Sequence, residues 1–216
     1  MCLSQSAIKT AVVYSAYGSR ASYYDDWQDA FNDANAFLST PFNIAQSNGR
    51  KTFIAAVQQF ELIVLLHSVN ADNLIYAKEI LPALQSRKGR LFSFVGNELS
   101  LPGAPLVPKI AFLKEAGTDI IATQLLKEAG DYLYSETGAQ VAAIPHALNP
   151  KNFQPRIAQR DRCVDVGVRS FRYPTIFLGD NDRNRLLDLF TNTAFDPALN
   201  IDIRTDQRLE RAEWAN

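Results

Sequence analysis

The segment Leu62–His67, which reads LIVLLH, constrains the fold of this chain more than any other stretch. Its residues are apolar without alternation, whereas a strand with one face in water alternates apolar and polar residues. The stretch Thr10–Tyr14 has the same continuous apolar character. Both patterns are typical of strands that helices cover on both faces, and we expect Leu62–His67 to lie centrally in a parallel sheet.

Strand patterns alternate with helical patterns along the first two thirds of the chain. Trp27, Phe31, Ala34 and Leu38 recur at helical spacing, and Leu74, Ala77 and Leu81 share the face of a later helix that Asn70 or Asp72 could cap. This alternation predicts an α/β fold with a doubly wound parallel sheet. The six expected strands are Thr10–Tyr14, Pro41–Ile44, Leu62–His67, Leu91–Val95, Asp119–Thr123 and Val141–Ile144.

A second strand-and-helix pattern follows a segment that has no apolar period. We expect a first domain over residues 1–149, a linker with two prolines over 150–162, and a second α/β unit over 163–216. In that unit Cys163–Val168 and Ile201–Ile203 read as strands and Arg183–Phe190 as a helix. Two or three strands cannot form a covered parallel sheet, so we expect the chain to stop inside this second domain.

Composition excludes several classes of protein. The 216 residues carry a formal net charge of −1, which gives no general attraction to nucleic acid. The two cysteines, Cys2 and Cys163, lie far apart and suggest neither a disulfide framework nor a zinc site. The chain begins without a basic cluster followed by an apolar core and has no run long enough to span a bilayer. We therefore expect a cytoplasmic protein without a bound metal.

Candidate binding residues follow the ends of the expected strands. Ligands bind parallel sheets outside the carboxyl ends of the strands, where loops and helix N-termini converge. Gly18, His67, the pair Asn97 and Glu98, and Gln124 should therefore lie along one edge of the sheet.

His67 and Glu98 each have two interpretations. The imidazole could bond a hydroxyl or phosphate or move a proton, or it could cap a loop together with Ser68 and Asn70. Glu98 could bind sugar hydroxyls with Asn97 or act as an acid or base, or it could be a solvated turn residue. A single carboxylate does not supply the pair that a glycosidase requires. His146, the other histidine, is expected to bond the backbone.

The loop Ser15–Arg20 excludes two nucleotide-binding motifs. It holds one glycine, Gly18, so it matches neither the dinucleotide fingerprint nor the phosphate loop with its lysine and hydroxyl. This argues against a nicotinamide-dependent dehydrogenase and a simple nucleotide hydrolase. Gly18 still permits close approach of a ligand to the backbone, although a tight turn alone could require it.

Two arginines follow the first strand of the second unit. Arg169 and Arg172 could bind a phosphate in a bidentate manner. Alternatively, they pair on a solvated face with nearby carboxylates of Asp165, Asp180 or Asp182.

The order of these parts resembles two-lobed glycosyltransferases of the GT-B type, in particular the broad "group 1" family. Ile144-Pro145-His146-Ala147-Leu148-Asn149 and Phe153-Gln154-Pro155 are similar to the family's exit from the N-terminal lobe, with His146-Ala147 in place of the usual Asn-Gly. Asp165-Val166-Gly167-Val168-Arg169, Tyr173-Pro174 and Leu178-Gly179-Asp180 look like the opening of the second lobe in a bacterial branch.

The resemblance implies that a Rossmann-like first lobe binds the acceptor and that the second lobe binds a nucleotide-diphosphate sugar as co-substrate, with no cofactor. Gly18, His67, Asn97 and Glu98 would line the acceptor side, and Arg169 and Arg172 the donor side. The transferase would act in bacterial polysaccharide or glycoconjugate synthesis, with peripheral membrane association of the full-length protein.

Catalytic residues are not assigned, because the family's acidic donor-binding motif would lie beyond Asn216, and we expect this chain alone to be inactive. Two alternatives stay open: a non-catalytic Rossmann-like module whose arginine-rich tail docks a partner, and a GT-B-type sugar-nucleotide epimerase.

Overall fold

The computed structural model describes residues 6–16, 24–71, 73–98, 105–147, 149–151, 158–170, 172 and 180–205. The chain forms two compact units, Met1–Ala147 and Leu148–Asn216. Each unit is treated by itself below.

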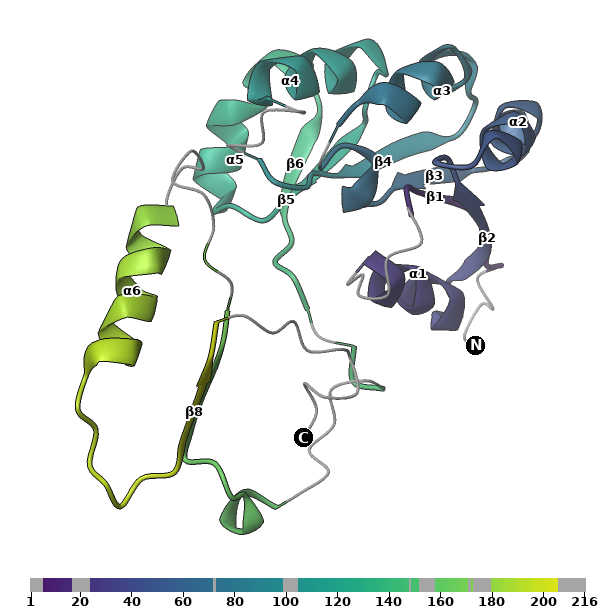
Figure 1. The fold of residues 1–216 in the computed structure, drawn as a ribbon. Helices are drawn as coiled ribbons and strands as arrows, with labels where there is room; N and C mark the ends of the chain where they lie inside the picture. The colour runs from purple at the N-terminus through teal and green to yellow at the C-terminus, as the bar shows by residue number, and fades with distance from the viewer. Residues whose placement is uncertain are drawn as a thin grey trace. The chain divides into compact units, whose positions relative to one another are not determined.

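The first unit is built on a six-stranded sheet in which every pair of neighbouring strands is parallel, a Rossmann-like arrangement (Figure 1). The strand order is β2-β1-β3-β4-β5-β6, so β3, the strand with the most continuous apolar sequence, lies in the interior of the sheet. The predicted parallel α/β sheet is confirmed. The strands are β1 (Ile8–Tyr14), β2 (Phe37–Asn43), β3 (Leu62–Leu65), β4 (Arg90–Phe94), β5 (Ile120–Thr123) and β6 (Gln140–Ala143).

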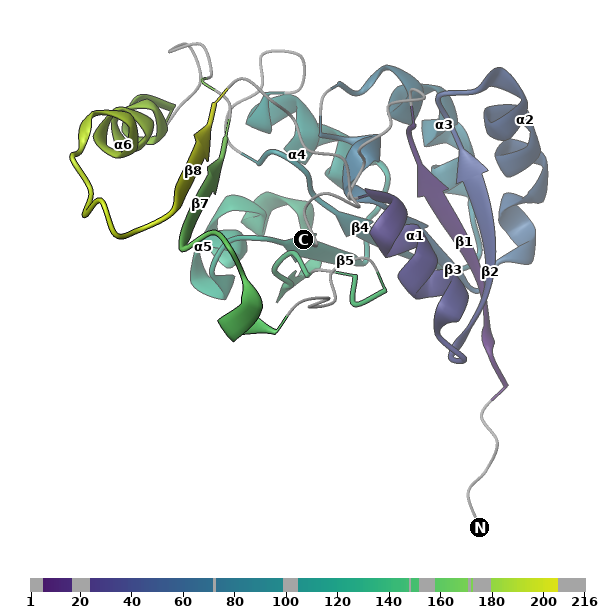
Figure 2. The same ribbon diagram turned by 60° about the horizontal axis from the view of Figure 1, so that its bottom comes forward.

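Helices lie on both faces of this sheet. In Figure 1, α2 (Ser47–Ala56), α3 (Ile75–Ser86) and α4 (Leu106–Glu115) lie along one face, and α1 (Tyr24–Asp33) lies on the other. Figure 2 brings the α1 face towards the viewer. The short helix α5 (Lys127–Leu133) connects β5 to β6. Among the described residues, no helix is both long enough and apolar enough to cross a membrane.

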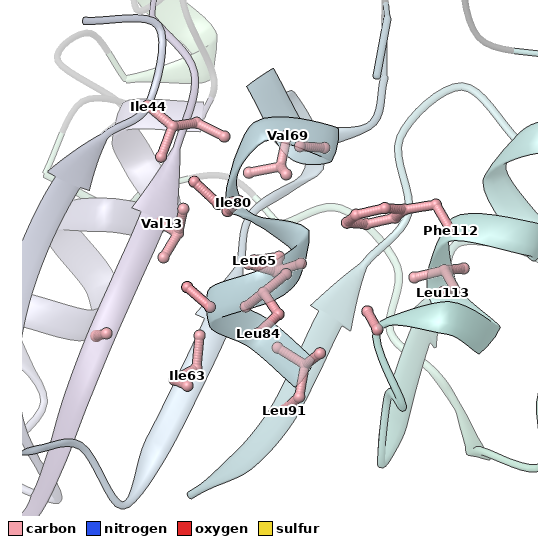
Figure 3. Close-up of a cluster of buried hydrophobic side chains, with 14 of the residues drawn as sticks. Val13, Ile44, Ile63, Leu65, Val69, Ile80, Leu84, Leu91, Phe112 and Leu113 are labelled. Carbon is pink, nitrogen blue, oxygen red and sulfur yellow. The ribbon is translucent and has the colours of Figure 1, made fainter. Parts of the chain in front are cut away.

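The larger core lies between the sheet and helices α2, α3 and α4. Strand side chains such as Val13, Ile63, Leu65 and Leu91 meet helix side chains such as Leu84, as Figure 3 shows. On the other face Val12 and Val64 pack with Trp27 and Phe31 of α1. Successive residues of β1 and β3 therefore enter different cores, which explains why these strands show no polar alternation.

The boundary between α1 and β2 differs from the prediction. Leu38, expected on the helical face, lies in β2, because α1 ends at Asp33 and the strand begins at Phe37. The ring centroids of Phe31 and Phe37 are 5.1 Å apart, so the turn brings the end of the helix against the start of the strand. Leu38 thus continues the helical spacing of apolar residues by chance, although it lies in a strand. The prediction that this strand begins only at Pro41 was wrong.

The capping of α3 by Asn70 was also predicted wrongly. The residue that precedes the helix is Leu74, which has no side-chain cap, and the amide of Ile75 instead donates to Oδ1 of Asn73 at 3.0 Å. Asp72, the other predicted cap, lies outside the described residues. The side chain of Asn70 serves a different purpose, described below.

The second unit contains a parallel strand pair, β7 (Val166–Arg169) and β8 (Ile201–Arg204), joined through helix α6 (Asp180–Asn192). The predicted strand at Cys163–Val168 begins three residues later. Asp165 and Asn200 explain the later start, because Asp165 N donates to Asn200 O at 2.8 Å and Asn200 N donates to Asp165 Oδ2 at 2.8 Å. These bonds set the register before the ladder begins.

Arg87 joins the carboxyl ends of α3 and α4 in the first unit. Its guanidinium group donates to the carbonyls of Leu84 and Ala116, both at 2.6 Å, and also to the carbonyl of Gly117. It further pairs with Asp119 at 3.2 Å, and its side chain is 10% exposed. Helix carboxyl ends leave carbonyl groups without helical partners and carry partial negative charge. One largely buried cation therefore satisfies two helix ends at once.

We predict that Arg87→Met lowers the free energy of unfolding by about 2–4 kcal/mol, because it leaves buried carbonyls and a carboxylate without their donor. Arg90 is the matched control. It pairs with the same Asp119 but is 80% exposed, so Arg90→Met should cost less than about 1 kcal/mol. Urea denaturation of the two variants measures the difference. Equal losses would contradict the role of Arg87.

Candidate functional site

The carboxyl edge of the sheet contains the point where the strand order reverses. The chain passes from β1 to β2 on one side, and then from β2 to β3 on the other side of β1. At such a point the connections leave in opposite directions, and the crevice between them is the usual ligand site of an open parallel sheet. The residues that follow β1 and β3 flank this point, and those that follow β4 and β5 continue along the same edge; together they form the candidate site.

The chain leaving β1 is held from both sides. The amide of Ser15 donates to Oγ of Ser68 at 2.9 Å, after β3. Asn43, at the end of β2, accepts from the amide of Ala16 at 3.1 Å and donates to its carbonyl at 3.2 Å. The start of this loop is thus fixed on each side of the reversal point. Gly18, the predicted site residue in the same loop, lies outside the described residues.

Asn70 connects the segment after β3 to the segment after β4. Its Nδ2 donates to the carbonyl of Phe94 at 2.9 Å, and its Oδ1 accepts from the amide of Gly96 at 2.9 Å. The side chain is buried. It therefore satisfies a donor and an acceptor at the point where the ladder of β4 ends, which is why it does not cap α3.

His67 lies beneath the surface at the end of β3, in the short 3₁₀ helix His67–Val69. Its ring centroid lies 5.4 Å from that of Trp27, 4.7 Å from that of Phe94 and 4.8 Å from that of His146. The residue is 0% exposed. His67 thus packs α1, β4 and the segment after β6 together, and in this structure a ligand at the surface does not reach its ring.

Burial also sets the protonation of His67. Desolvation, together with the neighbouring His146, lowers its pKa from 6.5 to about 3. Burial likewise lowers the pKa of His146 below its ordinary value. His67 is therefore a neutral imidazole near pH 7, and it supplies no positive charge for a phosphate.

Glu98 is a buried carboxylate held at one oxygen. Its Oε1 accepts hydrogen bonds from the hydroxyl of Thr123, at the end of β5, and from the hydroxyl of Tyr134 at 2.9 Å. Burial raises the pKa of Tyr134 above its usual range, and the nearby Glu98 carboxyl raises it further. The Tyr134 hydroxyl therefore keeps its proton and donates the hydrogen bond. Of the two interpretations of Glu98, the solvated turn residue is wrong, because only 7% of the residue is exposed.

The second oxygen of Glu98 differs from the first. Within the described residues, Oε2 accepts no hydrogen bond. A carboxylate that is fixed at one oxygen and open at the other can accept a hydrogen bond from a ligand hydroxyl in a defined direction. The neighbouring Asn97 is exposed at the same edge.

The arginines predicted to bind a donor lie in the second unit. Arg169 is the last residue of β7, opposite Arg204 of β8, and its side chain is outside the described part. Arg172 forms an ion pair with Asp188 of α6. Its observed partner is therefore none of the predicted Asp165, Asp180 and Asp182.

The opposite, amino edge of the sheet is occupied by structural contacts. A polar groove of about 540 Å³ lies there, lined by Arg87, Lys88, Arg90, Asp119 and neighbouring residues. Arg87 and Asp119 in its wall already bind each other, and Arg87 also binds the helix ends. Among the described residues, no cluster of three or more histidine, cysteine, aspartate or glutamate side chains could hold a metal ion.

Several residues of the edge were not predicted from sequence. Asn43, Ser68, Thr123 and Tyr134 each contact another segment at a strand end, and so does Lys109, which is fully buried in α4. The position rule that selected His67 and Glu98 would also have found Ser68 and Thr123. Lys109 and Tyr134 belong to helical patterns, and nothing in their spacing indicates that they reach the edge.

Comparison of the chain with protein-family models, with curated proteins and with solved structures gave no match.

We predict a specific pH dependence of stability from His67. The pKa of His67 is 6.5 in the unfolded chain and about 3 in the folded chain, so the folded protein binds this proton only at lower pH. Unfolding therefore takes up a proton between these values. The free energy of unfolding is therefore independent of His67 protonation above pH 6.5. It falls as the pH is lowered from 6.5 towards 3, by up to about 1.4 kcal/mol per pH unit.

His67→Phe should remove the part of the pH dependence that comes from His67, while it keeps an aromatic ring against Trp27 and Phe94. Urea denaturation at pH 4.5 and at pH 7 should show a smaller difference for the variant than for the wild type. His146→Phe is the control and should change the difference less, because His146 is more exposed. The same pH dependence in His67→Phe and wild type would exclude His67 as its source.

Proposed function

We propose that the chain belongs to a sugar-nucleotide-dependent glycosyltransferase, that its first unit binds the acceptor and that its second unit contributes to binding the donor. The observation that carries this proposal is Glu98, a buried carboxylate at the carboxyl edge whose Oε1 is fixed by two hydroxyls and whose Oε2 accepts no hydrogen bond from the described residues. Carbohydrate hydroxyls are donors that such an oxygen can accept. The order of segments in the sequence supports the same assignment.

Glu98 and Asn97 would contact the acceptor directly. The carboxylate accepts from one hydroxyl, and the exposed amide of Asn97 can bond a neighbouring hydroxyl. Fixing the acceptor in this way lowers the entropic cost of bringing its reactive oxygen to the anomeric carbon of the donor. His67, which is buried, would contribute by holding α1 and the segment around His146 against the edge, while Gly18 would allow a ligand to approach the loop after β1.

Arg169 and Arg172 would face the donor diphosphate, whose developing charge requires cationic or backbone donors. Arg172 is paired with Asp188, so donor binding by Arg172 requires exchange of this partner. A solvated ion pair of this kind contributes little to stability, and its exchange for a diphosphate is therefore inexpensive.

The function is tested on the purified protein. A panel of UDP-, GDP- and dTDP-sugars is screened for a rise in melting temperature, since a ligand that binds only the folded state stabilises it. Transfer to methyl pyranosides is then measured with the donors that bind. Binding of a donor with transfer supports the proposal. Binding with conversion of the donor to an isomer would indicate an epimerase instead, and no binding would indicate a module without this activity.

We predict that Glu98→Gln lowers kcat/KM for the acceptor about ten- to a hundredfold, the effect of losing one hydrogen bond to a charged group. Donor binding should stay unchanged. Glu128→Gln is the control, because Glu128 is an exposed residue in the first turn of α5. If Glu98→Gln retained full transfer while its melting temperature matched the wild type, Glu98 would not be an acceptor residue.

A further inference from the structure

The turn between β4 and α4 contains a backbone conformation that its sequence does not favour. Asn97 has φ of 46°, and it is the one residue other than glycine with positive φ in the described part of the chain. The left-handed region is unfavourable for a residue with a side chain, although asparagine tolerates it better than most. Such a conformation persists only where surrounding contacts hold it.

Lys109 supplies one of these contacts. It lies in the first half of α4, is 0% exposed, and donates from Nζ to the carbonyls of Gly96 at 2.6 Å and Asn97 at 2.5 Å. Burying an ammonium group is costly unless hydrogen bonds replace its water. Two consecutive carbonyls can point at one cation only when the peptide between them has a fixed orientation. Lys109 therefore holds the conformation of Asn97.

Both neighbours of Asn97 are fixed as well. A Cβ atom on Gly96 would lie 2.6 Å from Cβ of Ala71 and 2.8 Å from the carbonyl oxygen of His67, so glycine is required there. The amide of Gly96 is bound by Asn70, and the Glu98 carboxylate is bound by Thr123 and Tyr134. Asn97 is thus an exposed residue between two buried and anchored ones.

We propose that Lys109 is a positioning residue, which holds the turn Gly96–Glu98 in the conformation that presents the Asn97 amide and the Glu98 carboxylate together to adjacent hydroxyls of a carbohydrate acceptor. The identity of the ligand rests on the proposed function. The physical role is preorganisation: the turn is ordered before the ligand arrives, so binding does not bear the entropic cost of ordering it. Lys109 acts through Asn97 and Glu98 and does not itself touch the acceptor.

The test is a double-mutant cycle in the purified protein, with methyl pyranosides as acceptors. Lys109→Met should raise the acceptor KM about tenfold or more and change kcat less than threefold. Glycine adopts positive φ without strain, so in an Asn97→Gly background Lys109→Met should raise KM less than threefold. Lys114→Met, at an exposed position near the end of the same helix, should have no effect. An equal rise of KM in both backgrounds would overturn the proposal.

Hydrogen exchange provides a readout that does not depend on transfer. Lys109→Met should speed amide exchange in the peptide that contains residues 96–98, and Lys114→Met should not. If Lys109→Met speeds this exchange but the wild type transfers no sugar, the proposed function and the carbohydrate ligand are wrong. The conformational role of Lys109 would then still hold. Unchanged exchange would refute that role. Lys109→Gln, which keeps one donor, replaces Lys109→Met if the latter does not fold.

Discussion

Parallel strands that helices cover on both faces create a problem at the point where the strands end, because the last backbone groups leave the ladder while still partly buried and need new partners. In the first unit the partners are side chains from neighbouring segments. Asn43 and Ser68 bind the backbone after β1, and Asn70 and Lys109 bind the backbone after β4. Side-chain hydrogen bonds therefore connect the segments along the carboxyl edge, and the loops after β1 and β4 begin from fixed points. The arrangement of the site depends on this requirement before it depends on any ligand.

The two edges of the sheet meet the same requirement with different results. At the amino edge, Arg87 binds the helix ends and Asp119, and Asp119 in turn accepts from the amide of Leu91, so these polar groups are used within the fold. At the carboxyl edge, the anchoring residues hold the turn Gly96–Glu98 so that Asn97 is exposed and Oε2 of Glu98 has no hydrogen bond within the described residues. This asymmetry agrees with the general rule for parallel sheets. The groove at the amino edge is consequently a weaker candidate for a binding site, although it is a clear depression.

The sequence predicted the class of fold because continuous apolar strands such as Leu62–Leu65 leave few other ways to be buried. It also predicted that His67 and Glu98 follow strand ends. It did not predict that both are buried, since burial depends on what packs over a strand end, and Trp27 and Tyr134 are distant in the chain. The assignment of Asn70 as a helix cap failed for a related reason. An asparagine near a helix start has several possible partners, and the choice was decided by the backbone of β4.

Three ionisable groups, His67, Glu98 and Lys109, are buried within one edge of one sheet. Each is costly to bury, and a packed strand end could be built from apolar side chains and amides alone, as Asn70 shows. The large core between the sheet and α2, α3 and α4 offsets the free energy lost by burying these three groups. Because the groups themselves lower stability, their presence is not explained by stability alone. Buried ionisable groups that gather at the ligand edge of a sheet are characteristic of sites where charge and direction matter. Under the proposed function, the fixed turn at Asn97 would give Glu98 and Lys109 a common purpose, because an acceptor surface made of one exposed amide and one carboxylate oxygen requires both to be held in place.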